Sequence, residues 1–308
     1  MSKISATLML LALPWTMSAG AATTQPAPER LELASVHAVV MDVDSGEVLY
    51  RKHADVAAPI ASVTKLMTAM VVLDAGQPLD EWLAIVDWPG ELEKNAYSRL
   101  RIGSEAQRRE LLRIALMSSE NLATNVLAQH HPGGNDGFIA AMNAKAAALG
   151  MTRSRFVDPA GLSPDNRASA ADLAELVRAA YQYPEIRELS TRYQHTARFR
   201  QPRYSLGYGN TNPLVASSRW QVDLTKTGYL REAGRCLAMV TEVDGRPLAL
   251  VLLNSFGTRT PLGDAGRVRR WITTGDGGRI AGAARDYERQ QVKALLESRA
   301  GDLSTTAQ

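Results

Sequence analysis

Strand-like segments lie at both ends of this chain, and the middle of the chain has a mostly helical pattern. Asp44-Ser45-Gly46 and Asp244-Gly245 each supply turn residues between two such segments, which predicts a hairpin near either end. This order indicates a single sheet that both ends of the chain complete, with a helical lobe inserted between them. We therefore predict an α/β (α+β) fold whose antiparallel sheet is flanked by helices. The candidate strands are residues 37–42, 47–51, 220–227, 236–243 and 247–254.

The most apolar segment of the chain runs from residue 60 to residue 75. Pro59 precedes it and Gly76 follows it, which is the usual punctuation of a helix. Because apolar residues occur nearly all round this helix, we expect it to be central and buried. Further helices are predicted at residues 107–117, 170–181, 266–274 and 283–299, the last two closing the chain.

The first residues have the layout of a secretory signal peptide. Lys3 is followed by the apolar run 8–15 and by small residues at 19–22. This run is too short to cross a bilayer, which takes about 20 residues, and no later stretch of the sequence is long and apolar enough to span a membrane. We therefore expect export and no transmembrane anchor. The predicted division is a signal peptide at 1–22, a linker at 23–33, a catalytic domain at 34–282, and a C-terminal helix with a disordered tail at 283–308, the tail beginning after Gly301.

Composition excludes several classes of function. Of the 308 residues, 45% are hydrophobic and 22% are charged, which is typical of a globular protein. No Lys/Arg run accompanies the net charge of +3, so binding to nucleic acid is not expected. The single cysteine, Cys236, cannot form an internal disulfide, and we expect it to be buried and inert. None of the five histidines has a metal-ligand spacing, so no metal or other cofactor is predicted.

The buried helix begins with a serine and a lysine three residues apart, Ser62 and Lys65. Residues at this spacing share one helix face, so the hydroxyl and the amine can meet. Burial lowers the pKa of a lysine, which lets its amine act as a base toward serine. The alternative is a serine that caps the helix and a lysine whose charge reaches the surface. A lysine inside such an apolar helix is costly unless it is used, which favours catalysis.

Two further short motifs follow in order. Ser119-Glu120-Asn121 comes after a predicted helix and supplies a hydroxyl and a carboxamide, although Ser119 could simply cap the next helix. Lys226-Thr227-Gly228 lies at the end of a strand-like run and supplies a positive charge, a hydroxyl donor and a residue without a side chain. Such a set can hold a carboxylate and let substrate backbone come close.

In this order the three motifs resemble the Ser-x-x-Lys, Ser-Asp-Asn and Lys-Thr-Gly trio of penicillin-binding proteins and class A β-lactamases, with Glu120 at the middle position of the second motif. The chain is most similar to the low-molecular-mass penicillin-binding proteins, and among them to the penicillin-binding protein 7/8 type, the D-alanyl-D-alanine endopeptidases. The resemblance extends over about residues 33 to 271. The matching segments are residues 59–73, 117–121, 156–163 and 224–228.

The resemblance implies a role for each motif. Ser62 would be acylated by the carbonyl of a substrate D-Ala, and Lys65 would be the base that activates it. Ser119 would pass a proton to the leaving amine. Asn121 would orient Lys65 and the substrate amide.

The third motif would bind the substrate. Lys226 and Thr227 would hold the carboxylate beside the scissile bond, and Gly228 would leave room for substrate backbone. The oxyanion would lie on the backbone N–H groups of Ser62 and Tyr229. The expected partners are peptidoglycan stem peptides and their cross-links, with β-lactams as slowly released acylating inhibitors. The expected location is the periplasm.

Three alternatives remain to be weighed. A D-alanyl-D-alanine carboxypeptidase would use the same residues on linear stem pentapeptides. A non-catalytic penicillin- or peptidoglycan-binding protein would not need Lys65 in an apolar helix. Fast β-lactam hydrolysis is disfavoured because residues 122–225 contain no Glu-x-x-x-Asn pattern, which carries the deacylating glutamate of class A β-lactamases.

Overall fold

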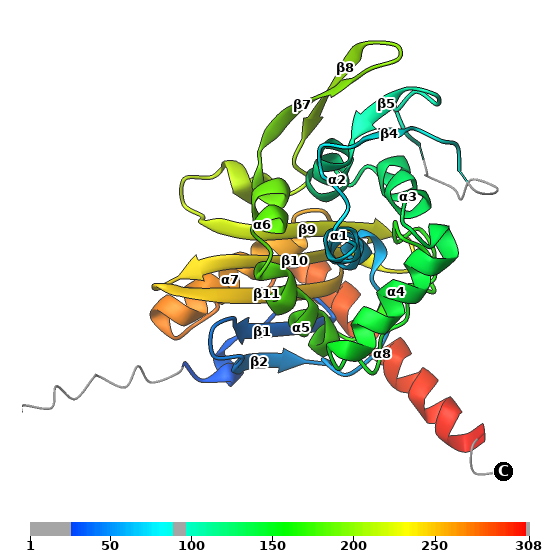
Figure 1. Cartoon of the computed structure of the whole chain (residues 1–308). Coiled ribbons are helices and arrows are strands. Elements are labelled where there is room, and N and C mark those ends of the chain that lie inside the picture. The colour runs from blue at the N-terminus through cyan, green and yellow to red at the C-terminus, as the bar shows by residue number, and fades with distance from the viewer. Residues whose placement is uncertain (1–25, 89–96, 306–308) are drawn as a thin grey trace, which may run out of the picture.

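The computed structural model describes residues 26–88 and 97–305, and a five-stranded sheet lies at its centre (Figure 1). All neighbouring strands are antiparallel, in the order β2-β1-β11-β10-β9. His37 of β1 pairs with Leu253 of β11, so the two chain ends meet in the middle of the sheet. This confirms the predicted architecture. The strands are β1 (His37–Asp42), β2 (Val48–Lys52), β9 (Val222–Leu230), β10 (Gly234–Val243) and β11 (Arg246–Ser255).

Both faces of the sheet are covered, so β1 is buried along its whole length. Successive side chains of a strand point to opposite faces. Val39 and Met41 belong to one apolar core, which they share with the helical lobe, and Ala38 and Val40 belong to a second core, which includes Trp271. Trp271 lies on α7 (Thr260–Thr274), the helix that packs against the second face. This two-sided burial explains why the interior of β1, residues 38–41, is apolar throughout instead of alternating.

The lobe between β2 and β9 is mostly helical and lies against one face of the sheet and beyond its β9 edge (Figure 1). Its helices are α1 (Lys65–Asp74), α2 (Arg108–Met117), α3 (Asn121–Gln129), α4 (Gly134–Ala148), α5 (Ala170–Tyr181) and α6 (Pro184–Thr191). Its short strand pairs are β3 (Ala58–Pro59) with β6 (Arg167–Ala168), β4 (Trp82–Ala84) with β5 (Glu105–Gln107), and β7 (Gln194–Phe199) with β8 (Tyr204–Gly209).

The central helix differs from its prediction in the first turn. Residues Ala61–Thr64 form a 3-10 turn, and α1 begins only at Lys65. Ala61 has a φ of +48°, outside the helical range, and its carbonyl accepts a bond from the Thr64 hydroxyl at 2.8 Å. The turn therefore places Ser62 just before the helix, while Lys65 begins α1.

Both terminal regions depart from expectation. Leu31 and Leu33, in the predicted linker, are buried, and Trp271 Nε1 donates to the Ala27 carbonyl at 2.9 Å. This segment therefore packs on the body of the protein. The last helix, α8 (Gly282–Thr305), continues past Gly301, where a disordered tail was expected to begin, and residues 306–308 lie outside the described part. The predicted signal peptide also lies outside it, and the domain boundaries stay a prediction.

No helix in residues 26–88 or 97–305 has the length and apolar character needed to span a membrane.

Candidate active site

Ser62 and Lys65 meet as their spacing predicted. The Lys65 Nζ donates to the Ser62 Oγ at 3.0 Å. Lys65 is only 1% exposed, at the start of an almost wholly buried helix. The alternative of a surface-reaching lysine is therefore wrong.

Two more acceptors hold the Lys65 amine in place. It donates to Asn121 Oδ1 at 2.8 Å and to the Ala160 carbonyl at 2.6 Å. Burial lowers the pKa of Lys65 to about 7, and the charges of Asp158 and Glu120 oppose that shift only in part. A lysine with such a pKa is partly neutral at neutral pH, so it can accept a proton from a hydroxyl.

The loop that carries Ala160 is built around Asp158. The Asp158 Oδ1 accepts the backbone N–H groups of Ala160 and Gly161 at 2.7 and 2.6 Å, and Oδ2 accepts that of Ser163 at 2.9 Å. Gly161 has a φ of +76°, and a Cβ there would lie 2.1 Å from the Ala61 carbonyl oxygen. Only glycine therefore fits where this loop meets the turn of the nucleophile.

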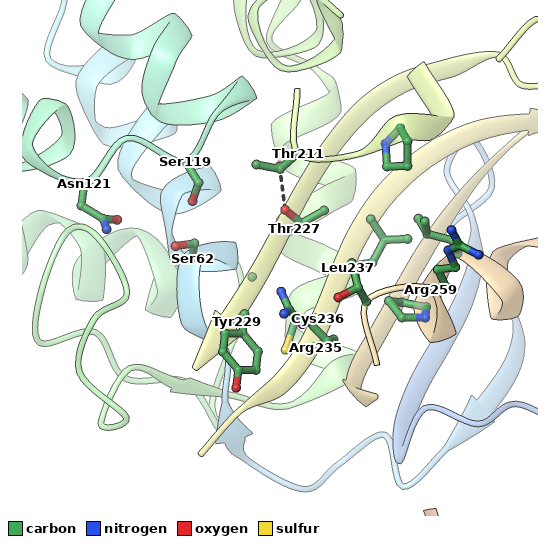
Figure 2. A pocket seen from close by; sticks show the side chains of 15 residues that line it. Ser62, Ser119, Asn121, Thr211, Thr227, Tyr229, Arg235, Cys236, Leu237 and Arg259 are labelled. Atoms are coloured by element: carbon green, nitrogen blue, oxygen red, sulfur yellow. Dashed lines mark hydrogen bonds between the residues drawn. The ribbon is translucent and has the colours of Figure 1, made fainter. Parts of the chain in front are cut away.

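Ser119 and Asn121 reach the site from the junction of α2 and α3. Ser119 has a φ of +62°, and this left-handed conformation changes the direction of the chain between the two helices. Glu120 is the N-cap of α3 and accepts the Ala123 N–H at 2.8 Å. The helix is therefore capped by Glu120 and not by Ser119. Ser119 and Asn121 line the cleft together with Ser62 (Figure 2).

The Lys226-Thr227-Gly228 motif lies inside β9, which extends to Leu230 instead of ending at the motif. Lys226 is 1% exposed and donates to the Thr227 carbonyl at 2.9 Å. Burial and the nearby charge of Lys65 hold its pKa well below the usual value. A Cβ on Gly228 would lie 3.1 Å from the Ser62 backbone nitrogen, so this glycine lets β9 approach the nucleophile.

These motifs border one cleft of about 580 Å³. Thr211 lies on its wall, and its hydroxyl is hydrogen-bonded with that of Thr227 at 2.6 Å (Figure 2). The Arg235 guanidinium stacks 3.9 Å from the ring centroid of Tyr229, and both residues line the cleft. Arg259 lines it as well.

Sequence reasoning missed several contributors. Thr211 has no motif around it and reaches Thr227 only through the fold. Asn166 was also missed, and its Oδ1 accepts the Val157 N–H at 2.7 Å. Asp158 and Pro159 are turn-forming residues, so their sequence held a signal for a tight loop. Nothing in it placed that loop beside Lys65.

Other reactive groups take no part in this cleft's chemistry. Cys236 is buried, and burial raises the pKa of its thiol to about 11, which keeps it protonated. Within the described residues no group of three or more His, Cys, Asp or Glu side chains is placed to hold a metal ion. The fold and the cleft therefore point to a serine hydrolase or acyl-transferase whose candidate serine contacts a buried lysine.

Comparison with known proteins places this class among the peptidases of peptidoglycan. A profile of peptidase family S11, described as D-alanyl-D-alanine carboxypeptidase, matches residues 21–257. A D-alanyl-D-alanine endopeptidase of Pseudomonas aeruginosa is 48% identical over 86% of this chain and 85% of its own length. One of Escherichia coli K12 is 46% identical over 92% of both chains. The chain belongs to the S11 family of D-alanyl-D-alanine peptidases.

Solved structures support the same fold. The DD-transpeptidase of Streptomyces K15 superposes with a TM-score of 0.72 at 25% identity, covering 79% of this chain and 98% of its own. Penicillin-binding protein D2 of Listeria monocytogenes, in its cefotaxime-bound form, gives a TM-score of 0.68 at 29% identity over 79% of this chain and 99% of its own. The fold class and the family predicted from the sequence are therefore confirmed.

Proposed function

We propose that this protein is a serine DD-endopeptidase that hydrolyses the D-alanyl cross-links of peptidoglycan through an acyl-enzyme on Ser62. The observation that carries the proposal is the contact of the Ser62 hydroxyl with Lys65, a buried lysine whose pKa is lowered to about 7, at the edge of an open cleft. The two relatives named D-alanyl-D-alanine endopeptidase, which match most of the chain, support the choice of substrate.

Acylation moves one proton and exchanges one bond. The neutral Lys65 amine takes the proton of Ser62 as its Oγ attacks the D-Ala carbonyl carbon. The oxyanion lies on the backbone N–H groups of Ser62 and Tyr229, which stabilise its charge. Ser119 hands a proton to the departing amine as the C–N bond breaks and regains one from the protonated Lys65. Water then attacks the ester and gives a proton to Lys65, which passes it to the Ser62 Oγ as the D-Ala carboxylate is released.

The wall opposite Asn121 binds the carboxylate next to the scissile bond. Thr227 and Thr211 present their paired hydroxyls there, and Arg259 adds a guanidinium to the same cleft. Lys226 lies directly behind this wall and is buried. A carboxylate bound here gains charge-assisted hydrogen bonds, which fix the substrate's direction in the cleft.

A carboxypeptidase acting on linear stem pentapeptides is the second candidate, because the matching family profile carries that description. Both reactions use the same groups and differ only in the size of the amine that leaves.

Two further properties follow from the proposal. The protein is exported to the periplasm, since residues 1–22 have the pattern of a signal peptide. β-Lactams acylate Ser62 and leave slowly, and the similar structure of penicillin-binding protein D2 with cefotaxime bound supports the binding of a β-lactam.

The deciding experiment is a digest of purified muropeptides by the protein without residues 1–22. Cross-linked dimers and linear pentapeptide monomers are digested together, and products are separated by chromatography and identified by mass. Dimers should fall to monomers, and Ser62→Ala should abolish the change. Loss of one D-Ala from pentapeptides with intact dimers would instead establish the carboxypeptidase. No change in either substrate by folded protein would favour a non-catalytic penicillin- or peptidoglycan-binding role.

A further inference from the structure

A second, smaller cavity of about 240 Å³ adjoins the catalytic cleft. Ser119 and Asn121 line both spaces, so the loop between α2 and α3 is their common wall. A ligand in the cleft that carries a branch past Ser119 can therefore enter this second space, called the side cavity below. Its remaining wall is formed by Tyr97, Arg99, Ser118, Glu120, Tyr208 and Gly209.

Arg99 is held in a fixed position at this cavity. Its guanidinium lies 4.7 Å from the ring centroid of Tyr208, and its Nη2 donates to the Gly207 carbonyl at 2.6 Å. A guanidinium has five N–H donors, so this bond leaves others for a ligand. Tyr208 is 7% exposed, and its hydroxyl has no hydrogen-bond partner among the described residues. An exposed planar cation with N–H donors to spare is a complement to a carboxylate.

Glu120 borders the same cavity but is engaged elsewhere. Its Oε2 accepts the Ala123 N–H at the start of α3. Burial raises the pKa of this carboxyl, which lies close enough to Tyr208 to raise the pKa of the phenol. An anionic ligand group is therefore favoured at the exposed Arg99 and disfavoured beside Glu120.

The proposed role of Ser119 puts the side cavity on the side of the scissile bond where the amine leaves. Gly209 lines the side cavity, and Thr211, two residues later, lines the cleft and contacts Thr227, where the substrate carboxylate binds. Ser119, the shared wall, is the group that hands a proton to the leaving amine in the proposed reaction. A substrate branch that passes Ser119 toward Arg99 therefore belongs to the leaving group.

The two candidate substrates differ in that leaving group. A linear pentapeptide releases a single D-Ala, whose only carboxylate is bound at Thr227. A cross-link releases the side-chain amine of a residue in a neighbouring stem, and that stem carries further carboxylates. Only the cross-link can fill the cleft and the side cavity at once.

We propose that the side cavity is a subsite for the acceptor stem, the peptide released as leaving group, and that Arg99 binds a carboxylate of that stem. This inference rests on the proposed endopeptidase function and names a determinant of its selectivity for cross-linked over linear peptides.

The chain offers a matched control for a test of Arg99. Arg101 stacks in the same way on a neighbouring tyrosine, 4.5 Å from the ring centroid of Tyr204, and does not line the side cavity. Arg99→Gln and Arg101→Gln therefore remove the same charge and the same kind of stacking. The substrates are a cross-linked dimer, a linear pentapeptide, and a fluorescent penicillin that reports acylation of Ser62.

The Arg99→Gln variant should lose about tenfold in kcat/KM on the dimer, since a charge-assisted hydrogen bond is removed. Its kcat/KM on the pentapeptide and its penicillin acylation should stay within about twofold of wild type, because neither fills the side cavity. Arg101→Gln should resemble wild type on all three. A dimer whose acceptor-stem carboxylates are amidated, except the one beside the scissile bond, should lower the kcat/KM of wild type by the same factor and should not lower that of Arg99→Gln further.

Three results would overturn the subsite. The first is an equal loss of activity by Arg99→Gln on all three substrates, and the second is no loss of kcat/KM by Arg99→Gln on the dimer. The third is a loss by Arg101→Gln equal to that of Arg99→Gln. The proposed function fails in a different way, since wild-type protein would then leave dimers intact while still cutting pentapeptides or binding penicillin.

Discussion

Acylation of Ser62 should slow as the pH falls through about 7, because Lys65 must be neutral before it can accept the serine proton. Burial lowers the pKa of Lys65 to about 7, against an ordinary lysine value near 10.4. Two pH units below that pKa, roughly 1% of the amine is neutral, whereas at pH 9 almost all of it is. The second-order acylation rate should therefore fall about tenfold per unit below pH 7, and about 100-fold between the plateau and pH 5.

Stopped-flow acylation by a fluorescent penicillin between pH 5 and pH 9 measures this profile, and circular dichroism at each pH checks that the protein is folded. Lys65→Arg is the control, because a guanidinium does not lose its proton in this range. Its rate should be about a thousandfold lower and should not follow the wild-type curve. A wild-type rate that is flat across the range, or an arginine variant acylated at nearly the wild-type rate, would refute the role of Lys65.

Three further changes test the supports of the site. Asp158→Asn removes a charge that raises the pKa of Lys65, so the inflection in the acylation profile should move below its wild-type pH. Gly161→Ala puts a Cβ against the Ala61 carbonyl at a φ of +76°, so it should lower the free energy of unfolding by about 2 kcal/mol or more and should also slow acylation. Gly46→Ala, at a φ of +73° in open space, should lower the free energy of unfolding by about 1 kcal/mol and leave the acylation rate unchanged. Ser169→Ala removes the N-cap of α5, a 3.0 Å bond from the Asp172 N–H, and should lower the unfolding free energy by about 1 kcal/mol with normal acylation. Normal acylation by Gly161→Ala, an unmoved inflection in Asp158→Asn, or a stability unchanged by Ser169→Ala would contradict the respective argument.

Most of the fold and the centre of the site could be predicted from local sequence patterns. Strand patterns at both ends predicted a sheet that both ends complete, because a strand buried on both faces, such as β1, has an apolar interior. The Ser62–Lys65 contact followed from helical spacing, which a single 3-10 turn preserves. The N-cap of α5 at Ser169 is likewise a contact within a few residues. In each case the pattern that supported the prediction is formed by residues close together in the chain.

The parts that sequence did not predict depend on contacts between distant residues. The Ala160 carbonyl accepts a hydrogen bond from Lys65, which lies 95 positions away in the sequence. The turn around Asp158 orients this carbonyl toward Lys65. Thr211 meets Thr227 because the segment after β8 folds back along β9. Leu31 lies in the predicted linker and is nevertheless buried, because a single apolar residue in a Pro-containing stretch gives no periodic signal of burial. The side cavity likewise brings together Arg99 and Tyr208, which no motif links.

The position of β9 explains how one cleft can serve an extended peptide. β9 is the last strand in the sheet order, so among the described residues its outer edge pairs with no further strand. Such an edge presents backbone N–H and C=O groups to which an extended peptide can add. The turn that carries Ser62 packs against β9, and Gly228 keeps the two backbones close at that point. In the proposed reaction, a peptide that adds along this edge would therefore place a backbone carbonyl beside Ser62 and its carboxylate at Thr227 of the same strand.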